Sequence, residues 1–411
     1  MKVAQVEPLI LNVSEKTNWF FVRITDEHGR AGIGEASLNG WEMAQLAYLE
    51  SLRPELLGKT ADEVVPRLRV YPHSPGGLIA SSIVSALEQA VTDLRARQAG
   101  VPVYALLGGD RRKMVRVYAN INRGARDRSP AGIAQYARNA VAAGFGAVKI
   151  APFDGAYWGD AASVDIERRV SDGVDRIYAI REAVGPDVAV MVDCHWRFDE
   201  PSALQLIRDL RAAKLYWLEC PVSENPEHFA ALKRVRAAAA ENGMQMAGAE
   251  RQVATSGFAP FIGDRLFDVV MPDIKYAGGY AEMLKIAAAC ARHSVHFSPH
   301  NPSGPVCNVA SMHLCAVAPA FLILEHQLAE SPLYFDAVGG FKPKIADGCF
   351  ELPDTPGIGI EGFFAGKLIT LARGGHHGMF IAPTGNVLAR FDHRHHRLGK
   401  SRITGPLRIG E

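Results

Sequence analysis

The chain opens with two stretches in which apolar and polar residues alternate, at residues 3–11 and 19–37. Alternation is typical of strands that bury one face, and the segment DEHGR inside the second stretch supplies a polar turn. Residues 82–100 instead repeat apolar side chains every three or four positions and end on a glycine, which predicts a long helix. We therefore expect residues 1–125 to form an α+β domain.

The pattern changes in residues 126–355, where short apolar runs alternate with helical segments. The runs are GAVKIAPF, VAVMVDCH, LYWLECP, MQMAGAER, LFDVVMPDI, VHFSPHN and FLILEHQ. The polar residues at their ends are mostly about 23 to 31 residues apart, which fits repeated βα units and a parallel sheet. A polar residue at the end of nearly every strand favours a closed (β/α)₈-like barrel, with an open doubly wound sheet as the alternative.

The regular pattern ends near residue 355, where the turn-rich segment PDTPGIGIE begins. We expect residues 356–411 to lead the chain back to the first domain and to finish in a polar tail. Three histidines in this tail (His393, His395 and His396) raise the idea of metal storage. Histidines beside arginines in a polar tail are more often simply solvated, and we favour that interpretation.

Charge and composition exclude several classes of function. The 411 residues carry a formal net charge of only +1, which gives no reason to expect binding to nucleic acid or to an anionic membrane. No apolar run is as long as a membrane span, and the first residues lack the apolar stretch of a signal peptide. The six cysteines form no C-x-x-C pair. We expect a cytoplasmic protein with reduced thiols.

Three acidic residues end consecutive predicted strands: Asp193, Glu219 and Glu250. The carboxyl ends of parallel barrel strands open onto the same face, so these carboxylates should converge. Converging carboxylates repel one another unless a cation neutralises them, and ligation by oxygen alone favours Mg²⁺ over Zn²⁺. The alternative is three unrelated acids in loops.

The next three strand ends carry Asp273, His300 and Glu325. An aspartate that binds one ring nitrogen of a histidine fixes its tautomer and makes it a better base. Lys149 ends the second strand, where its cation would lie near a substrate carboxylate and the developing negative charge. His195 lies two residues after the first acid and should face the same pocket. An ordinary loop histidine and a surface lysine are the plainer alternatives.

This order of residues resembles the enolase superfamily, specifically its mandelate racemase-like branch. The resemblance covers nearly the whole chain and includes the segments AGIGEAS, ALEQAVTDL, GVPVYALLGG and VVMPDIKYAGG. It implies a modified (β/α)₇β barrel under an N-terminal α+β capping domain. It also implies Mg²⁺ bound by the three carboxylates, with His300 and Asp273 as the catalytic dyad.

One departure from the racemases bears on the chemistry. Racemases of this branch carry K-x-K at the second strand, whereas this chain has Lys149-Ile150-Ala151 and so lacks the second lysine. The pairs Asp193-x-His195 and Glu250-Arg251 instead resemble the galactonate dehydratase-like group, in which the extra histidine acts as an acid.

The resemblance thus implies dehydration of an aldonate or aldarate to a 2-keto-3-deoxy acid. His300 would remove the C2 proton, Glu325 would donate a hydrogen bond to the enolate, and His195 would protonate the C3 hydroxyl. A cycloisomerase or epimerase using the same enolate, and a non-catalytic sugar-acid binding barrel, remain alternatives. We expect four side chains to contact the substrate: Lys149, Arg251, Trp19 and His73. Trp19 and His73 lie in capping loops expected around residues 12–41 and 71–77, and Trp41 is a further possible contact there. Barrels of this kind commonly associate, so we expect a homo-oligomer.

Overall fold

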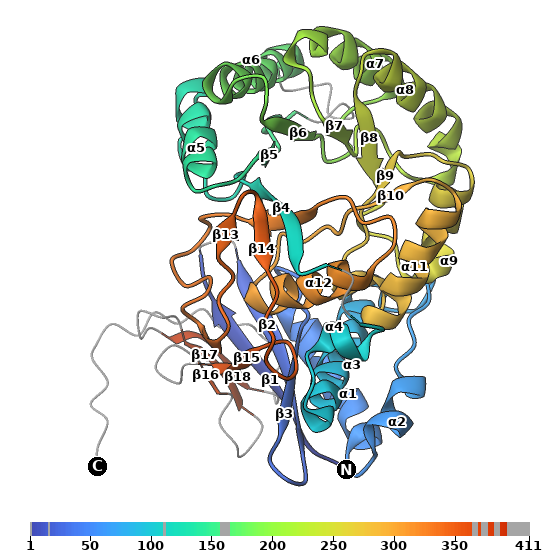
Figure 1. Cartoon of the computed structure of the whole chain (residues 1–411), viewed down its shortest axis with the longest axis vertical. Coiled ribbons are helices and arrows are strands. Elements are labelled where there is room, and N and C mark those ends of the chain that lie inside the picture. Colours follow the sequence, from blue (N-terminus) through green and yellow to red (C-terminus); the bar gives the residue numbers. More distant parts are fainter. Residues whose placement is uncertain are drawn as a thin grey trace.

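The fold is given by a computed structural model, shown in Figure 1. It describes residues 2–14, 17–109, 112–156 and 165–363, and the backbone of three strands at residues 369–370, 377–381 and 387–392. The histidines at positions 393, 395 and 396 lie outside the described residues. Among the described residues, no helix combines the length and the apolar character that crossing a membrane requires.

The N-terminal part is an antiparallel sheet with strand order β16-β1-β2-β3, covered by helices. Its strands are β1 (Val3–Asn12), β2 (Asn18–Asp26), β3 (Ala31–Glu35) and β16 (Ile369–Thr370). The helices are α1 (Glu42–Leu56), α2 (Ala61–Val64), η1 (Val65–Arg67), α3 (Gly77–Ala99) and α4 (Val103–Leu106). The predicted α+β capping domain is confirmed.

Helix α3 packs so closely on β3 that only glycine fits at two positions of that strand. A Cβ atom on Gly32 would collide with the carbonyl oxygen of Ala90, and one on Gly34 with that of Ala86. The helix ends at Gly100, which adopts the left-handed conformation that glycine reaches without steric cost. The glycines of AGIGEAS therefore allow the sheet and α3 to form one core.

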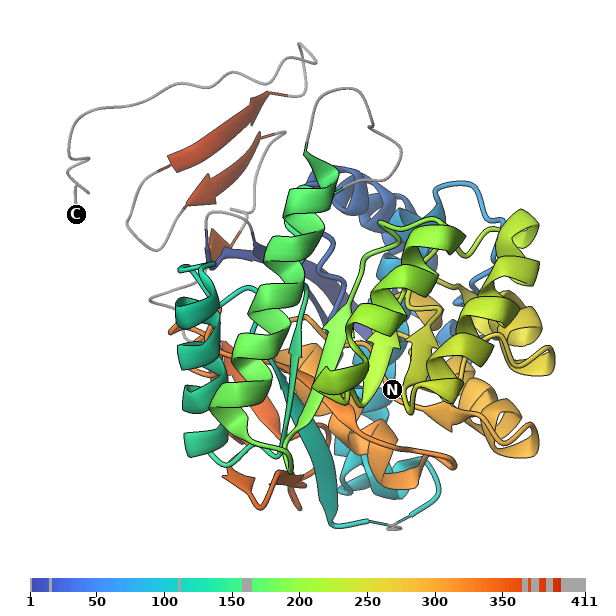
Figure 2. The same ribbon diagram turned by 90° about the horizontal axis from the view of Figure 1, so that it is seen from above.

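The second part is a ring of parallel strands surrounded by helices (Figures 1 and 2). The strands are β4 (Met114–Asn120), β5 (Ala147–Ile150), β6 (Ala189–Asp193), β7 (Trp217–Glu219), β8 (Gln245–Gly248), β9 (Val269–Val270), β10 (His296–Phe297) and β11 (Leu324–Gln327). The helices are α5 (Pro130–Ala142), α6 (Ile166–Val184), α7 (Glu200–Asp209), η2 (Arg211–Ala213), η3 (Pro226–His228), α8 (Phe229–Glu241), α9 (Ala254–Gly263), α10 (Ile274–Ala277), α11 (Tyr280–Arg292) and α12 (Pro305–Val317).

The ring closes because β11 pairs with β4 in parallel register, and the segment before β11 hydrogen-bonds to β10 through Phe297. Its interior is filled by buried side chains such as Tyr118, Met191 and Trp217. Helices cover the outer face of the strands, so both faces are buried and the strands show continuous apolar runs. The predicted (β/α)₇β barrel is confirmed, and the open sheet is excluded.

One strand lies on the other side of the predicted boundary. Met114–Asn120 was assigned to residues 1–125, but as β4 it pairs with both β5 and β11 inside the barrel. Its first residues alternate between exposed and buried, and they pair in antiparallel register with β14 (Cys349–Glu351) and not with a neighbouring barrel strand. This alternation concealed the similarity to the other barrel strands.

The C-terminal segment adds short antiparallel strands. They are β12 (Val338–Gly340), β13 (Ile345–Ala346), β15 (Ile360–Phe363), β17 (His377–Ile381) and β18 (Val387–Asp392). Strand β15 pairs with β12, and β16 pairs with β1 of the N-terminal sheet through the registers Leu9–Thr370 and Ile10–Ile369. The chain therefore has a backbone connection from its C-terminal part to its first strand.

Candidate active site

A cavity of about 250 Å³ lies at the carboxyl ends of the barrel strands, beneath side chains of the N-terminal domain. The barrel contributes polar and charged side chains from nearly every strand end, as expected for this architecture. The lining includes Asn120, Asn122, Arg123, Lys149, Ala151, Asp193, His195, Glu250, Arg251, Lys275, Tyr276, His300, Ser303 and Glu325. The N-terminal domain contributes Thr17, Trp19, Ser37 and Asn39.

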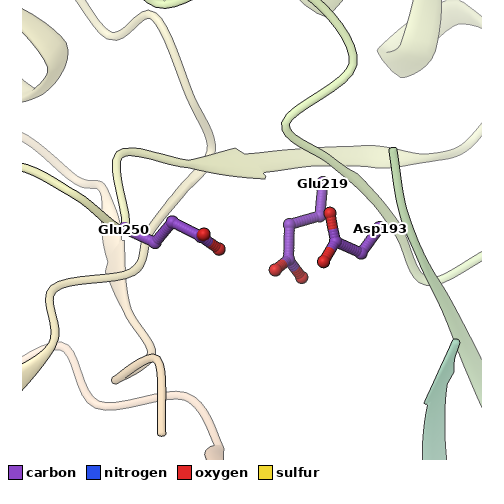
Figure 3. A group of neighbouring side chains, drawn as sticks. All are labelled: Asp193, Glu219 and Glu250. Carbon is purple, nitrogen blue, oxygen red and sulfur yellow. The ribbon is translucent and has the colours of Figure 1, made fainter. Parts of the chain in front are cut away.

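Asp193, Glu219 and Glu250 converge as predicted (Figure 3). Asp193 and Glu219 are the last residues of β6 and β7 and are paired directly across these strands, and Glu250 follows β8. Their three ligand oxygens lie within 4.8 Å of one another, and all three side chains are buried. The parallel register thus brings residues that are distant in sequence to one point.

The electrostatics of this cluster fit a divalent cation. Burial, together with the carboxylates of Asp193 and Glu325, raises the pKa of Glu219 to about 8. Burial and the other two acids likewise raise the pKa of Glu250 well above its ordinary value, and its buried Oε2 makes no hydrogen bond with the described residues. Buried carboxylates without compensation are costly, and a hard cation with oxygen ligands would remove that cost. The acidic cluster can therefore hold a metal.

Lys149 lies between the acidic cluster and Glu325. Its Nζ is 2.8 Å from Glu219 Oε1 and 2.9 Å from Glu325 Oε1, and its side chain is buried. Burial opposes its charge, but the two carboxylates raise the pKa of Lys149 well above its ordinary value. The lysine is therefore a permanent cation at the centre of the site.

Both carboxylate oxygens of Glu325 accept hydrogen bonds. Asn120 Nδ2 donates to its Oε1 at 2.7 Å and Asn301 N donates to its Oε2 at 2.8 Å. Burial opposes its ionisation, yet Lys149 and His300 keep the pKa of Glu325 below its ordinary value. These contacts favour an ionised acceptor, whereas the sequence analysis predicted a hydrogen-bond donor. The difference arises because sequence patterns do not reveal how many donors converge on one acid.

His300 and Asp273 form the predicted dyad. Nδ1 of His300 lies 2.8 Å from Asp273 Oδ2, while Nε2 faces the cluster at 3.4 Å from Glu250 Oε2. Burial lowers the pKa of His300 below its ordinary value, so the ring is neutral and able to accept a proton. The same Asp273 oxygen also accepts a hydrogen bond from Lys275 Nζ at 2.7 Å.

His195 lines the same cavity and pairs with Asp193. Its Nε2 is 2.9 Å from Asp193 Oδ2, and its backbone N–H donates to Asp193 Oδ1 at 2.8 Å. The carboxylate of Asp193 raises the pKa of His195 above its ordinary value. This shift favours the protonated form, and an imidazolium whose side chain is 39% exposed would be able to act as an acid toward a group in the cavity.

The predicted substrate contacts divide into two groups. Arg251 lines the cavity and stacks its guanidinium over Trp196 at 4.9 Å, and Trp19 lines the cavity from the N-terminal domain. His73 and Trp41 do not line the cavity, and Trp41 is 54% exposed. The loops of the N-terminal domain that reach the site are thus those around Thr17 and Asn39.

Sequence reasoning missed several lining residues. Lys275 stands two residues after Asp273 at a strand end, a spacing that also identified His195, so the signal was present. Asn120 ends β4 and Arg123 follows it, and both were missed because that strand was not counted among the barrel strands. Ser303 was missed because it lies in an irregular loop after β10.

The similarity of the chain to known proteins agrees with this geometry. Residues 4–108 match the N-terminal domain of mandelate racemase / muconate lactonizing enzyme, and residues 132–362 match an enolase C-terminal domain-like family. A D-galactonate dehydratase of Verminephrobacter eiseniae is 31% identical over 84% of this chain and 88% of its own length. A D-gluconate dehydratase of Thermoproteus tenax is 28% identical, covering 87% of this chain and 72% of its own.

Solved structures show the same fold. A member of the enolase superfamily from Salmonella Typhimurium superposes with a TM-score of 0.78 at 25% identity, covering 90% of this chain and 100% of its own. The matched domains account for both the cap and the barrel. The chain therefore belongs to the mandelate racemase / muconate lactonizing enzyme family of the enolase superfamily.

Proposed function

We propose that the protein is a Mg²⁺-dependent dehydratase of a sugar acid, which it converts to a 2-keto-3-deoxy acid. The observation that carries the proposal is that the acidic cluster, the His300–Asp273 dyad and His195 meet at one cavity. Similarity to dehydratases of D-galactonate and D-gluconate supports the same reaction and a small-molecule substrate. The cytoplasmic location and the homo-oligomer stay predictions.

The Mg²⁺ would be held by Asp193, Glu219 and Glu250. Their oxygens converge, and the neighbouring side chains do not supply enough positive charge to neutralise the three carboxylates. When bound, the ion acts as a Lewis acid that stabilises the negative charge developing on the substrate carboxylate. Lys149 adds a fixed positive charge beside the same cluster. The ionised Glu325 orients that lysine by accepting from its Nζ.

Proton transfer then falls to the two histidines. His300 accepts the C2 proton on Nε2, while Asp273 holds Nδ1 and stabilises the imidazolium that forms. The electron pair of the C2–H bond first moves into the substrate carboxylate to give an enolate, and it then forms the C2–C3 double bond as the C3–O bond breaks. His195 gives its proton to the departing hydroxyl, so water leaves and an enol remains. The enol tautomerises to the 2-keto-3-deoxy acid.

Position 151 argues against racemisation. A racemase needs a base on each face of the enolate, one to remove the proton and one to return it. Ala151 lines the cavity where the second lysine of the racemase pattern would stand, and alanine transfers no proton. The loss of water from C3 requires an acid instead, which His195 provides.

The test is to incubate the protein with a library of aldonic and aldaric acids and Mg²⁺, and to measure 2-keto-3-deoxy acids colorimetrically. At least one sugar acid should be converted, and removing the metal with EDTA should stop the reaction. His300→Asn is the matched inactive control. Racemisation of (R)- or (S)-mandelate, without keto acid from any sugar acid, would overturn the proposal.

A further inference from the structure

The wall of the cavity opposite the acidic cluster is built from the loops after β4 and β11. In the closed ring of eight described strands, β4 stands four positions from β8 and β11 four positions from β7. Asn122 and Arg123 follow β4 on this far wall, and Thr17 and Asn39 of the N-terminal domain also line the cavity. A substrate whose C1 carboxylate lies at the acidic cluster would extend its other end toward Arg123.

Behind this wall, Glu330 binds two of the lining side chains at once. Thr17 Oγ1 donates a hydrogen bond to Glu330 Oε1, and Arg123 Nη1 lies 3.4 Å from Glu330 Oε2. The Glu330 side chain is only 4% exposed, whereas that of Arg123 is 34% exposed. The positive charge of Arg123 is therefore already compensated by a carboxylate that the substrate does not displace.

The other cationic side chains near the cavity differ in whether a carboxylate pairs with them. Lys149 pairs with Glu219 and Glu325, and Lys275 pairs with Asp273. Arg251, next to Glu250, forms an ion pair with none of the described carboxylates, and it stacks on Trp196. A cation with no carboxylate partner among the described residues thus lies at the end of the cavity where the acidic cluster is. The far wall presents hydroxyl and amide groups together with Arg123, which Glu330 already pairs.

We propose that Glu330 is a specificity-determining residue that restricts the site to polyhydroxy acids with a single carboxylate. This inference rests on the proposed function and narrows its substrate class from sugar acids in general to aldonates. The hydroxyls of an aldonate tail find hydrogen-bonding partners on the far wall. The second carboxylate of an aldarate meets the negative charge of Glu330 and an arginine that this charge has neutralised. Repulsion of the wrong ligand is a common source of specificity.

Binding can be measured apart from turnover in the His300→Asn background. We would titrate that variant, with Mg²⁺, calorimetrically with D-galactonate and galactarate, and with D-gluconate and D-glucarate. These pairs differ only in the oxidation of C6. Each aldarate should bind at least about tenfold more weakly than its aldonate, because its second carboxylate would be placed near the like charge of Glu330.

Glu330→Gln in the same background keeps an acceptor for Thr17 but removes the charge. The aldarate-to-aldonate affinity ratio should rise about tenfold, since Arg123 becomes free to bind the second carboxylate. Adding Arg123→Gln should abolish this gain. Glu200→Gln is the matched control, because Glu200 also pairs with an arginine (Arg234, at 2.5 Å) but at the surface, and the ratio should not change.

The outcomes separate the two proposals. The specificity role of Glu330 would be overturned by any of three results. These are an aldarate that binds as tightly as its aldonate, an affinity ratio that Glu330→Gln does not change, and no binding of any sugar acid. If the His300→Asn variant discriminates in binding as expected but the wild type forms no keto acid from any aldonate, the proposed function fails while the specificity role of Glu330 stands.

Discussion

Lys149 illustrates how strongly single charges are coupled in this site. It contacts Glu219 of the acidic cluster and Glu325 on the far side, so one cation serves two carboxylates. Asp193 is balanced by His195, whereas Glu250 has no comparable partner: its Oε2 makes no hydrogen bond with the described residues. The negative charge that lacks a cationic partner is therefore concentrated on Glu250, and this residue is the most informative one for testing the metal site.

Glu250→Gln should abolish stabilisation by metal. In the wild type, saturating Mg²⁺ should raise the melting temperature, because a ligand at 100 times its Kd adds about 2.7 kcal/mol to the free energy of unfolding. In the variant most of this increase should disappear, while the metal-free protein should be no less stable, because a repulsive buried charge has been removed. Glu241→Gln, at an exposed position, is the control. An undiminished Mg²⁺ effect in Glu250→Gln would contradict the site.

The two histidines should have separable effects on activity. His300→Asn should reduce exchange of the substrate C2 proton with solvent deuterium by about 10²-fold or more, the usual contribution of a general base. His195→Asn should spare that exchange and slow formation of the keto acid by a similar factor. NMR in D₂O measures both quantities, and His293→Asn, an exposed histidine, serves as control. Equal loss of exchange in both variants would leave the acid and base roles unsupported.

Site residues at strand ends were predictable from the sequence, and those held by long-range contacts were not. Asp193, Glu219 and Asp273 follow apolar runs, and parallel strands bring such positions together. Glu330 lies outside any strand, and its importance appears only when Thr17, over three hundred residues earlier, is seen to bind it. No local pattern contains that information.

Strand β11 shows how alternation divides one element between two functions. Glu325 points into the barrel toward Lys149, and the next residue, His326, points outward into an aromatic cluster. The His326 ring stacks on Phe145 and Phe335 at 5.8 and 6.1 Å and meets Phe350 edge-on at 5.1 Å. This opposite orientation was expected from strand geometry.

The buried His326 should make the protein sensitive to acid. Burial lowers its pKa from 6.5 to about 4, so as the pH falls the unfolded chain takes up a proton before the folded chain does. The stability is complete above pH 6.5 and is lost between pH 6.5 and 4, by about 3 kcal/mol at most. His326→Phe, which retains aromatic packing, should reduce the loss of stability between pH 7 and 4.5 by roughly 2 kcal/mol.

Urea denaturation at the two pH values measures this difference. His293→Gln is the matched control because that histidine is exposed, and it should leave the pH dependence as in the wild type. An identical pH dependence in His326→Phe and the wild type would mean that the histidine is not buried in its neutral form.

The elements themselves were largely predictable, and their exceptions have physical causes. Buried strands such as β6 and the long helix α3 have patterns that follow directly from burial on one or both faces. Strand β4 was misassigned because its first residues alternate between exposed and buried positions and pair with β14, not with a barrel strand. The predicted lid contact His73 failed to reach the cavity because loop composition does not determine the direction in which a loop extends.

The cap and the barrel are joined by buried acids of the cap that accept hydrogen bonds from barrel main-chain groups. Glu35, the last residue of β3, binds Gly304 N at 2.7 Å and Cys307 N at 2.9 Å at the start of α12. Glu88 of α3 binds Tyr280 N at 2.8 Å at the start of α11. Since Gly304 directly follows Ser303 of the cavity wall, the cap helps to position the loop that carries His300.

Glu35→Ala should weaken this junction. Two buried main-chain N–H groups would lose their acceptor, at a cost of about 1–3 kcal/mol each. We expect a loss of at least about 2 kcal/mol in the free energy of unfolding by urea, accompanied by a lower kcat. Ser37→Ala removes one donor to Glu35 and leaves one main-chain N–H group, that of Phe20, without its acceptor, so it should cost about 1–3 kcal/mol and less than Glu35→Ala. Equal stability of Glu35→Ala and the wild type would contradict the role of Glu35 in joining the domains.

The most direct test of the account is proton NMR of the wild-type protein with Mg²⁺ and aldonates in D₂O. We predict that at least one aldonate loses its C2 proton and its C3 hydroxyl together, and yields a 2-keto-3-deoxy acid carrying one deuterium at C3. The deuterium is expected because the enol must take its new proton from solvent. Exchange or inversion at C2 without loss of water from any aldonate would contradict the account.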